Sequence, residues 1–222
     1  MKMRKQILSE EKRVFSKFRS PYDIQLFLNS IAYNPKEKCK SPVEVIKERS
    51  ANCLEGAIFA AAALKFLGYK PLILDMSAEN DDDHVIAVFR GNGCYGAVAK
   101  SNTTVLRYRE PVYKSIRELV MSYFEVYFNI IGEKTLRTYS MPISLDMFNT
   151  YNWISTKKDL NIIGDYLYTI KHYDILTPKQ VKELSRADSL LVKACFLGAV
   201  KKGIFKPKEK GKKSGRSGNL KI

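Results

Sequence analysis

The sequence predicts an α+β domain in which a buried helix packs on a small antiparallel sheet. Residues 53–67 are almost wholly apolar, so we expect a helix that is buried on every side. Three apolar segments follow, at residues 71–76, 84–90 and 94–99, and each has the length and composition of a short buried strand. The residues Gly91-Asn92-Gly93 are typical of a hairpin turn. A helix followed by an antiparallel meander belongs to the α+β class.

Capping signals delimit the elements around this core. The sequence Ser41-Pro42-Val43-Glu44 predicts a helix start at residue 42, with Ser41 as the cap and Glu44 completing a capping box. Gly68 is expected to end the apolar helix. Upstream, residues 1–18 have an amphipathic pattern, and residues 21–34 are expected to form a short helix or extended segment that ends before a proline.

The later half of the chain is expected to be mostly helical, with helices within residues 111–131, 159–172 and 178–199. We therefore divide the chain into four parts, which are an N-terminal helical arm at 1–40, a core at 41–110, a helical C-terminal part at 111–200 that packs on the core, and a disordered basic tail at 201–222.

The basic tail carries much of the charge, +8 of a formal net charge of +15. From residue 206 on, lysine, glycine and serine dominate, a composition that cannot bury a core and predicts disorder. Non-specific contact with a polyanion is the expectation for such a tail. No aromatic residue follows Phe205, so stacking on nucleic-acid bases is not indicated.

Composition excludes several classes of protein. The four cysteines lie far apart and only two histidines are present, which argues against a zinc site, and no other metal or cofactor is indicated. No segment approaches the roughly 20 apolar residues of a membrane helix, and residues 1–20 lack the apolar region of a signal peptide. We expect a soluble cytoplasmic protein with reduced thiols.

Cys53 is the candidate nucleophile. A thiol in the first turn of a helix lies close to unsatisfied backbone N–H groups and to the positive end of the helix dipole. Both favour the thiolate, which is the reactive form. The alternative is that Cys53 is a small buried hydrophobe, the usual state of a cytosolic cysteine.

Two further residues lie where they can join Cys53. His84 begins the second predicted strand, and Asn102 follows the third. Because hairpin strands are antiparallel, the start of one lies beside the end of the other, so His84 and Asn102 are expected at one edge of the sheet. If the start of the apolar helix packs against that edge, a thiol, an imidazole and an orienting amide meet, as in nucleophilic catalysis.

These positions resemble a known family. The pattern Cys53-x-Glu55-x-Ala57 at a helix start, the Leu67-Gly68-Tyr69-Lys70-Pro71 turn and Asp83-His84-Val85 at the next strand resemble the transglutaminase-like superfamily. The resemblance covers residues 41–102 and implies a papain-like core. It implies Cys53 as nucleophile, His84 as general base and acid, and Asn102 as the residue that orients His84, as an asparagine does in papain-like proteases.

The reaction implied is acyl transfer or hydrolysis at a peptide or amide bond, through an acyl-enzyme on Cys53. Backbone N–H groups at the start of the helix would receive the oxyanion, together with Asn52 or Asn34. Arg107 is a candidate contact for an acidic substrate or a phosphate, or else a structural ion-pair partner.

Other polar residues have simpler interpretations. Glu55 is expected to complement the helix dipole. The acidic run at residues 81–83 is expected to be a solvated turn rather than a calcium loop, since it lacks the alternating oxygen ligands and the glycine of such a loop. His172 is expected at the surface or in packing.

The leading hypothesis is a transglutaminase-like cysteine enzyme with a Cys53–His84–Asn102 triad, a hydrolase rather than a crosslinking enzyme. The alternative is a catalytically inactive member of the same fold that serves as a binding or scaffold module. A third hypothesis is a basic protein associated with nucleic acid through its tail.

Overall fold

An antiparallel sheet divides the fold into two apolar layers. The structure is a computed structural model that describes residues 12–208. Within these residues the main sheet has seven strands in the order β6-β5-β4-β3-β7-β9, with β8 pairing with β3 beside β7. The strands are β3 (Leu72–Ala78), β4 (His84–Gly91), β5 (Cys94–Val98), β6 (Arg109–Tyr113), β7 (Leu136–Ser140), β8 (Ile143–Ser144) and β9 (His172–Asp174).

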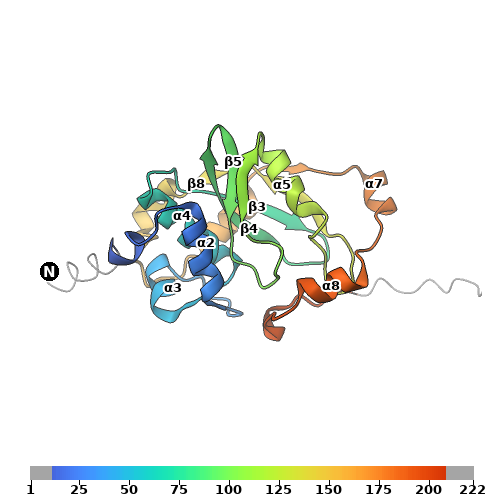
Figure 1. Cartoon of the computed structure of the whole chain (residues 1–222), viewed down its shortest axis with the longest axis horizontal. Coiled ribbons are helices and arrows are strands. Elements are labelled where there is room, and N and C mark those ends of the chain that lie inside the picture. Colours follow the sequence, from blue (N-terminus) through green and yellow to red (C-terminus); the bar gives the residue numbers. More distant parts are fainter. Residues whose placement is uncertain (1–11, 209–222) are drawn as a thin grey trace, which may run out of the picture.

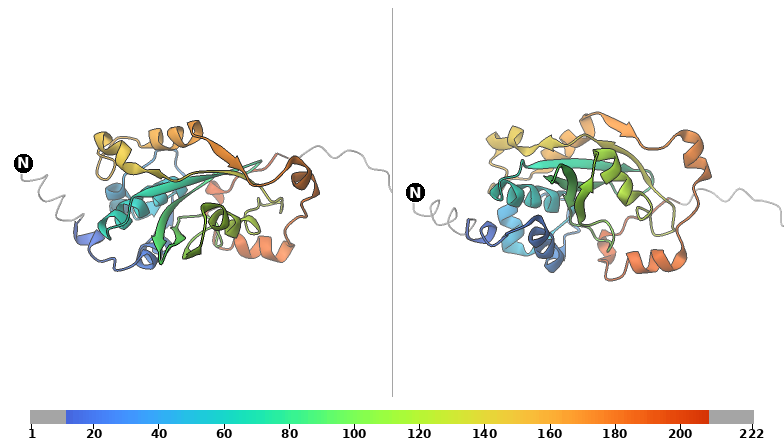
Figure 2. Two further views of the ribbon diagram at one scale, coloured as in Figure 1. Left: turned by 90° about the horizontal axis from the view of Figure 1, so that it is seen from above. Right: turned by 45° about the horizontal axis from the view of Figure 1, so that its top comes forward.

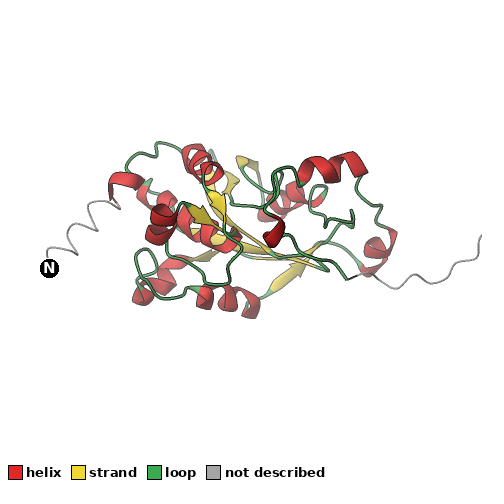
Figure 3. Ribbon diagram, turned by 90° about the horizontal axis from the view of Figure 1, so that it is seen from below, coloured by secondary structure: helices red, strands yellow, loops and turns green. Residues whose placement is uncertain are grey.

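Helices cover both faces of this sheet (Figures 1, 2 and 3). The α-helices are α2 (Pro21–Ser30), α3 (Pro42–Glu48), α4 (Cys53–Phe66), α5 (Ile116–Phe124), α6 (Asn161–Thr169), α7 (Pro178–Glu183) and α8 (Ser189–Cys195). The described part also contains a helical stretch at residues 12–15, two 3₁₀ helices, η1 (Leu145–Tyr151) and η2 (Lys201–Gly203), and a two-stranded parallel pair, β1 (Ala32–Tyr33) with β2 (Ser50–Ala51).

The two layers explain why β3, β4 and β5 are apolar almost throughout. Ile73, Ala87 and Val98 face the layer that holds α2, α4 and α6, whereas Leu74 and Val88 face α5. A strand covered on both faces needs apolar residues at every position, so it lacks the alternation of a half-exposed strand. The predicted hairpin is confirmed, since β4 and β5 pair in antiparallel register on either side of residues 92–93.

Helix α4 is central to the first layer, as predicted. Its residues from Glu55 to Leu64 are buried, and Asn52 caps it by accepting the N–H of Glu55. Gly68 follows the helix with a φ of +89°, a conformation that glycine adopts without strain. The predicted start of α3 is also found, with half of its capping box: Glu44 accepts the N–H of Ser41 at 3.3 Å, whereas the Ser41 hydroxyl makes no cap hydrogen bond.

The later half of the chain is not mostly helical, and this prediction was wrong. It supplies β6, β7, β8 and β9, which pair with the strands of the core. The long helix expected at 111–131 is only the nine residues of α5, and the segment at 178–199 forms two short helices, α7 and α8. The core therefore does not end at residue 110, because its sheet is completed from the C-terminal half.

Residues 201–208 were assigned to the disordered tail, and this part of the assignment was also wrong. Lys201–Gly203 form η2, and the side chain of Asn80 binds the main chain of Lys208. Polar side chains of the body thus hold this segment although its own composition favours disorder. The tail beyond residue 208 and the arm before residue 12 lie outside the described residues.

No helix in residues 12–208 combines the length and the apolar character that a membrane crossing requires.

Gly56 in α4 provides a test of the packing. A Cβ at this position would lie 2.2 Å from Cβ of Lys100, whose ammonium group donates to the carbonyls of Leu28 and Ile31 at 2.8 and 2.6 Å. A glycine-to-alanine change inside a helix normally stabilises by about 1 kcal/mol. Here we expect Gly56→Ala to lower the free energy of unfolding by about 1–3 kcal/mol in urea denaturation, because Lys100 cannot move away.

Gly164→Ala in α6 is the matched control. Its Cβ would meet only the side-chain end of Leu54, at 3.0 Å, which can rotate away. We expect a change within about 0.5 kcal/mol. Equal effects of the two substitutions would contradict this account of the α4 packing.

Candidate functional site

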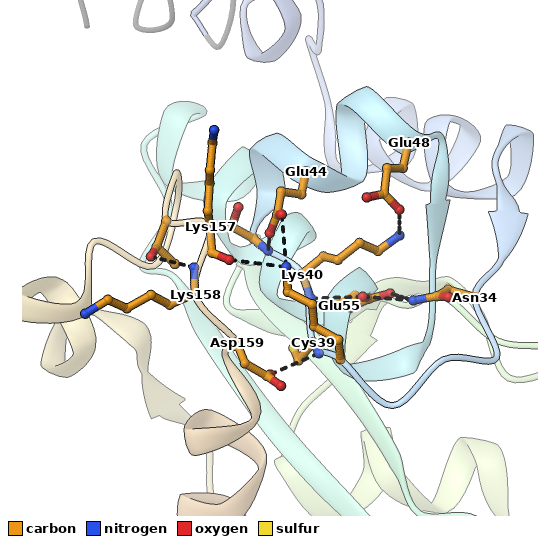
Figure 4. A network of polar contacts seen from close by, with 12 residues as sticks. Asn34, Cys39, Lys40, Glu44, Glu48, Glu55, Lys157, Lys158 and Asp159 are labelled. Carbon is orange, nitrogen blue, oxygen red and sulfur yellow. Dashed lines mark hydrogen bonds and ion pairs between the residues drawn. The ribbon is translucent and has the colours of Figure 1, made fainter.

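A buried carboxylate fixes the start of α4, where Cys53 lies. Glu55 is fully buried and accepts hydrogen bonds from Nδ2 of Asn34 and from the backbone N–H groups of Lys40 and Asn52, at 2.7 to 3.0 Å (Figure 4). Burial raises the pKa of Glu55, and these donors oppose the rise. The role predicted for Glu55, complementing the helix dipole, is thus only part of its function, because it also joins two loops to the helix.

The thiol of Cys53 is half-buried and its sulfur contacts the carbonyl oxygen of Asp83 at 3.8 Å. Burial raises its pKa to about 11, outweighing the backbone N–H groups that act in the opposite direction. The expectation that the helix start favours the thiolate is therefore wrong for this conformation. Desolvation is the larger effect, and the resting group is a neutral thiol.

His84 is buried at the start of β4, and its two ring nitrogens differ. Nε2 lies 3.0 Å from the carbonyl oxygen of Leu106. Because a carbonyl can only accept, Nε2 carries the proton of the neutral ring and Nδ1 has the lone pair. Burial, followed by the charge of Arg109, lowers the pKa of His84 to about 4, so the ring is neutral at pH 7.

The other ring nitrogen of His84, Nδ1, has no hydrogen-bond partner among the described residues, and His84 lines a cavity. Within residues 12–208, the one side-chain nitrogen or oxygen that is both fully buried and without a partner is Oγ of Ser41. Because Nδ1 lacks a partner but is not such an atom, it is not fully buried. The cavity that His84 lines has a volume of about 450 Å³ and is also lined by Cys53, Tyr33 and Tyr127.

Cys53 and His84 thus share a cavity without a direct hydrogen bond. The side chain of His84 lies on the sheet face of Ile86 and Val88, where its ring meets that of Tyr127 edge-on at 6.5 Å. The thiol comes from α4, on the opposite face, and reaches the backbone at the edge of β4.

Asn102 lines the same cavity but is engaged elsewhere. Its side-chain oxygen accepts the N–H of Val200 at 2.9 Å, and its Nδ2 donates to the carbonyls of Val200 and Gly203 at 3.0 and 2.8 Å. The group that contacts the imidazole is the Leu106 carbonyl. A triad that includes Asn102 stays a prediction, since its amide holds the C-terminal segment in this conformation.

The three weaker candidates have structural contacts. Asn52 and Asn34 line the cavity, but the oxygen of Asn52 caps α4 and the amide of Asn34 binds Glu55. Arg107 does not line the cavity, and its guanidinium donates to the carbonyl of Thr103 and to Oδ1 of Asn29. A substrate contact by Arg107 stays a prediction, and the described residues give it hydrogen bonds to neutral groups rather than an ion pair.

The acidic turn is more structured than expected. Oδ1 of Asp83 accepts the hydroxyl of Ser77 and the N–H of Ala78, and Oδ2 of Asp81 accepts the hydroxyl of Thr135. Burial raises the pKa of Asp81 to about 6. Within the described residues no cluster of acidic, histidine or cysteine side chains is arranged to hold a metal ion.

His172 is neither a free surface residue nor simple packing. Its Nε2 lies 3.0 Å from a carboxylate oxygen of Asp75, which is buried in β3, and its Nδ1 contacts the carbonyl of Ile170. Burial and the charge of Asp83 raise the pKa of Asp75 to about 6. The sequence contained a signal for this pair, because an aspartate inside an apolar strand requires a partner.

Leu106 and Tyr127 were missed. Leu106 acts through its backbone carbonyl, which no residue pattern can reveal. Tyr127 was assigned to core packing, and it is buried, but its hydroxyl also donates to the carbonyl of Asp82 at 2.7 Å and so holds the turn that precedes His84.

The chain matches no protein-family model, and no curated protein matches it significantly.

The depressed pKa of His84 predicts a contribution to acid sensitivity. The unfolded chain binds a proton at His84 near pH 6.5, whereas the folded protein does so only near pH 4. The contribution of His84 to stability is therefore present above pH 6.5 and is lost as the pH falls toward 4. Asp75 and Asp81, with raised pKa values, act in the opposite direction over this range.

We expect His84→Gln to lose less stability than the wild type between pH 6.5 and 4.5, by about 1–3 kcal/mol, in urea denaturation at a series of pH values. The control is the range from pH 7.5 to 8.5, where His84 is neutral in both the folded and the unfolded protein. There the free energies of unfolding of the two proteins should change in parallel. Parallel curves at acid pH as well would show that His84 is not a buried neutral base.

Proposed function

We propose that this protein is a thiol-dependent hydrolase or acyltransferase that acts on a peptide or amide bond through Cys53 and His84. The observation that carries the proposal is the shared cavity, which is lined by a thiol at a helix start and by an imidazole with a free lone pair. The Leu106 carbonyl holds the ring in the tautomer that a general base requires.

Each group has a defined part in this reaction. As the sulfur of Cys53 adds to the substrate carbonyl carbon, the thiol proton passes to Nδ1 of His84. The carbon–nitrogen bond then breaks, and the imidazolium returns the proton to the leaving amine. Water hydrolyses the thioester and restores the thiol. The backbone N–H groups of Cys53 and Leu54, which have no acceptor one turn earlier, would bind the oxyanion, whereas that of Glu55 is taken by the side chain of Asn52.

The second candidate function is a non-catalytic binding module. The neutral resting pair favours it, because the thiol has a pKa of about 11 and the imidazole a pKa of about 4. Proton transfer from thiol to imidazole is strongly uphill between groups with such values. Catalysis therefore requires a change that brings the pKa of Cys53 and the pKa of His84 closer together. Such a change could come from a bound substrate or from movement of residues that line the cavity.

Acylation by an activated ester separates the two functions. We expect p-nitrophenyl acetate to acylate Cys53, detected by intact mass and peptide mapping, and His84→Ala to slow this step about 100-fold through loss of the base. Cys53→Ala should abolish the adduct, and Cys94→Ala, at the start of β5 and outside the cavity lining, should leave the rate unchanged. Equal acylation of the wild type and His84→Ala would exclude the catalytic pair and favour the binding module.

A further inference from the structure

Part of the C-terminal segment at residues 200–208 forms a wall of the cavity that Cys53 lines. The chain leaves α8, whose last residue Cys195 accepts the N–H of Thr104 at 2.9 Å, and turns through η2 (Figure 1). Residues 202–205 then line the cavity together with Cys53 and His84. This segment belongs to the wall of the site although it is remote from the site in sequence.

Two asparagines hold the segment by its main chain, with the same geometry. The amide oxygen of Asn102 accepts the N–H of Val200, and its Nδ2 donates to the carbonyl of Val200. The amide oxygen of Asn80 likewise accepts the N–H of Lys208 at 2.8 Å, and its Nδ2 donates to that residue's carbonyl at 3.2 Å. Contacts of this kind bind a peptide without regard to its side chains, because every residue except proline offers both groups.

One position of the segment requires a glycine. A Cβ on Gly203 would lie 2.6 Å from Cε1 of Tyr33 and 3.2 Å from Nδ2 of Asn102. The main chain of Gly203 is therefore pressed against the cavity wall, and its carbonyl accepts a third hydrogen bond from Asn102, at 2.8 Å. A larger residue must move either the segment or the side chains of Tyr33 and Asn102 that hold it.

The segment has little else to hold it. Each side chain of residues 196–208 is exposed or only half-buried, so the segment contributes little to the apolar core. Four lysines, at positions 201, 202, 206 and 208, lie in this segment, and the cavity that it lines has Asp81, Asp82 and Asp83 in its wall. A segment held by a few main-chain hydrogen bonds can open without unfolding of the core.

We propose that residues 200–208 are an intramolecular peptide that forms one wall of the cavity, and that the strip on which they lie is a groove for an extended basic polypeptide, bound through its main chain by Asn80 and Asn102. The segment thereby restricts access to Cys53 and must leave before another polypeptide enters. The inference that a substrate enters when the segment leaves rests on the proposed function. The inference that the segment lies in a peptide-binding groove does not.

The test uses the full chain and needs no turnover. Gly203→Val should displace the segment, so we expect iodoacetamide to alkylate Cys53 at least about tenfold faster than in the wild type, and trypsin to cleave after Lys202 faster by a similar factor. Lys201→Ala is the matched control, because residue 201 does not line the cavity, and it should leave both rates unchanged. Unchanged rates in a folded Gly203→Val protein would overturn the proposal.

Asn102→Ala is the second variant, and it gives opposite results for two roles of this residue. If Asn102 holds the segment, its loss raises the alkylation rate of Cys53. If Asn102 instead serves only to orient His84 toward the thiol, its loss lowers that rate and counts against the proposal.

A synthetic peptide of residues 198–208 completes the test. Added to the Gly203→Val protein, it should slow alkylation of Cys53 toward the wild-type rate, as should the same peptide with Lys201→Ala. A peptide with Gly203→Val should not, and protection by all three peptides alike would overturn the groove. If protection is observed but no acyl-enzyme forms with the activated ester, the groove stands and the hydrolase function fails.

Discussion

The buried carboxylate of Glu55 is the constraint on which the site depends. It lies one turn into a helix whose other buried side chains are apolar, and it has no route to solvent. Its oxygens are satisfied only by N–H groups from three separate segments, at Asn34, Lys40 and Asn52. A buried charge without such donors would be too costly to keep. The helix start is therefore fixed to two loops that are remote in sequence, and the thiol of Cys53 is fixed with it.

Desolvation then determines the chemistry at the end of this fixed helix. Cys53 and His84 both lie where burial disfavours the charged form, and the result is a neutral thiol and a neutral base that line one cavity. In this state the thiol and the imidazole are unreactive. The C-terminal segment lines part of the same cavity and is held there by the side-chain amide of Asn102, the residue that was predicted to orient His84.

The parts of this fold that the sequence predicts are those that local patterns define. Helix α4, its hairpin and the start of α3 have strong local signals, and each is found where expected. Strand β7 was not predicted, and its Thr138 and Tyr139 pair with strands that are distant in sequence, β3 on one side and β9 on the other. The site shows the same division. Cys53 and His84 could be found as residue types at element starts, whereas the Leu106 carbonyl and the hold of Asn102 on residue 200 depend on tertiary structure alone.

The proposed chemistry depends on His84 being a neutral base, with its proton on Nε2 and its lone pair on Nδ1. Nitrogen-15 NMR of the imidazole rings measures this directly, and with only two histidines in the chain a single His172→Gln variant assigns the signals. We predict the Nε2–H tautomer for His84 at pH 7, with no protonation above about pH 5. An Nδ1–H tautomer, or an imidazolium at pH 7, would contradict the account.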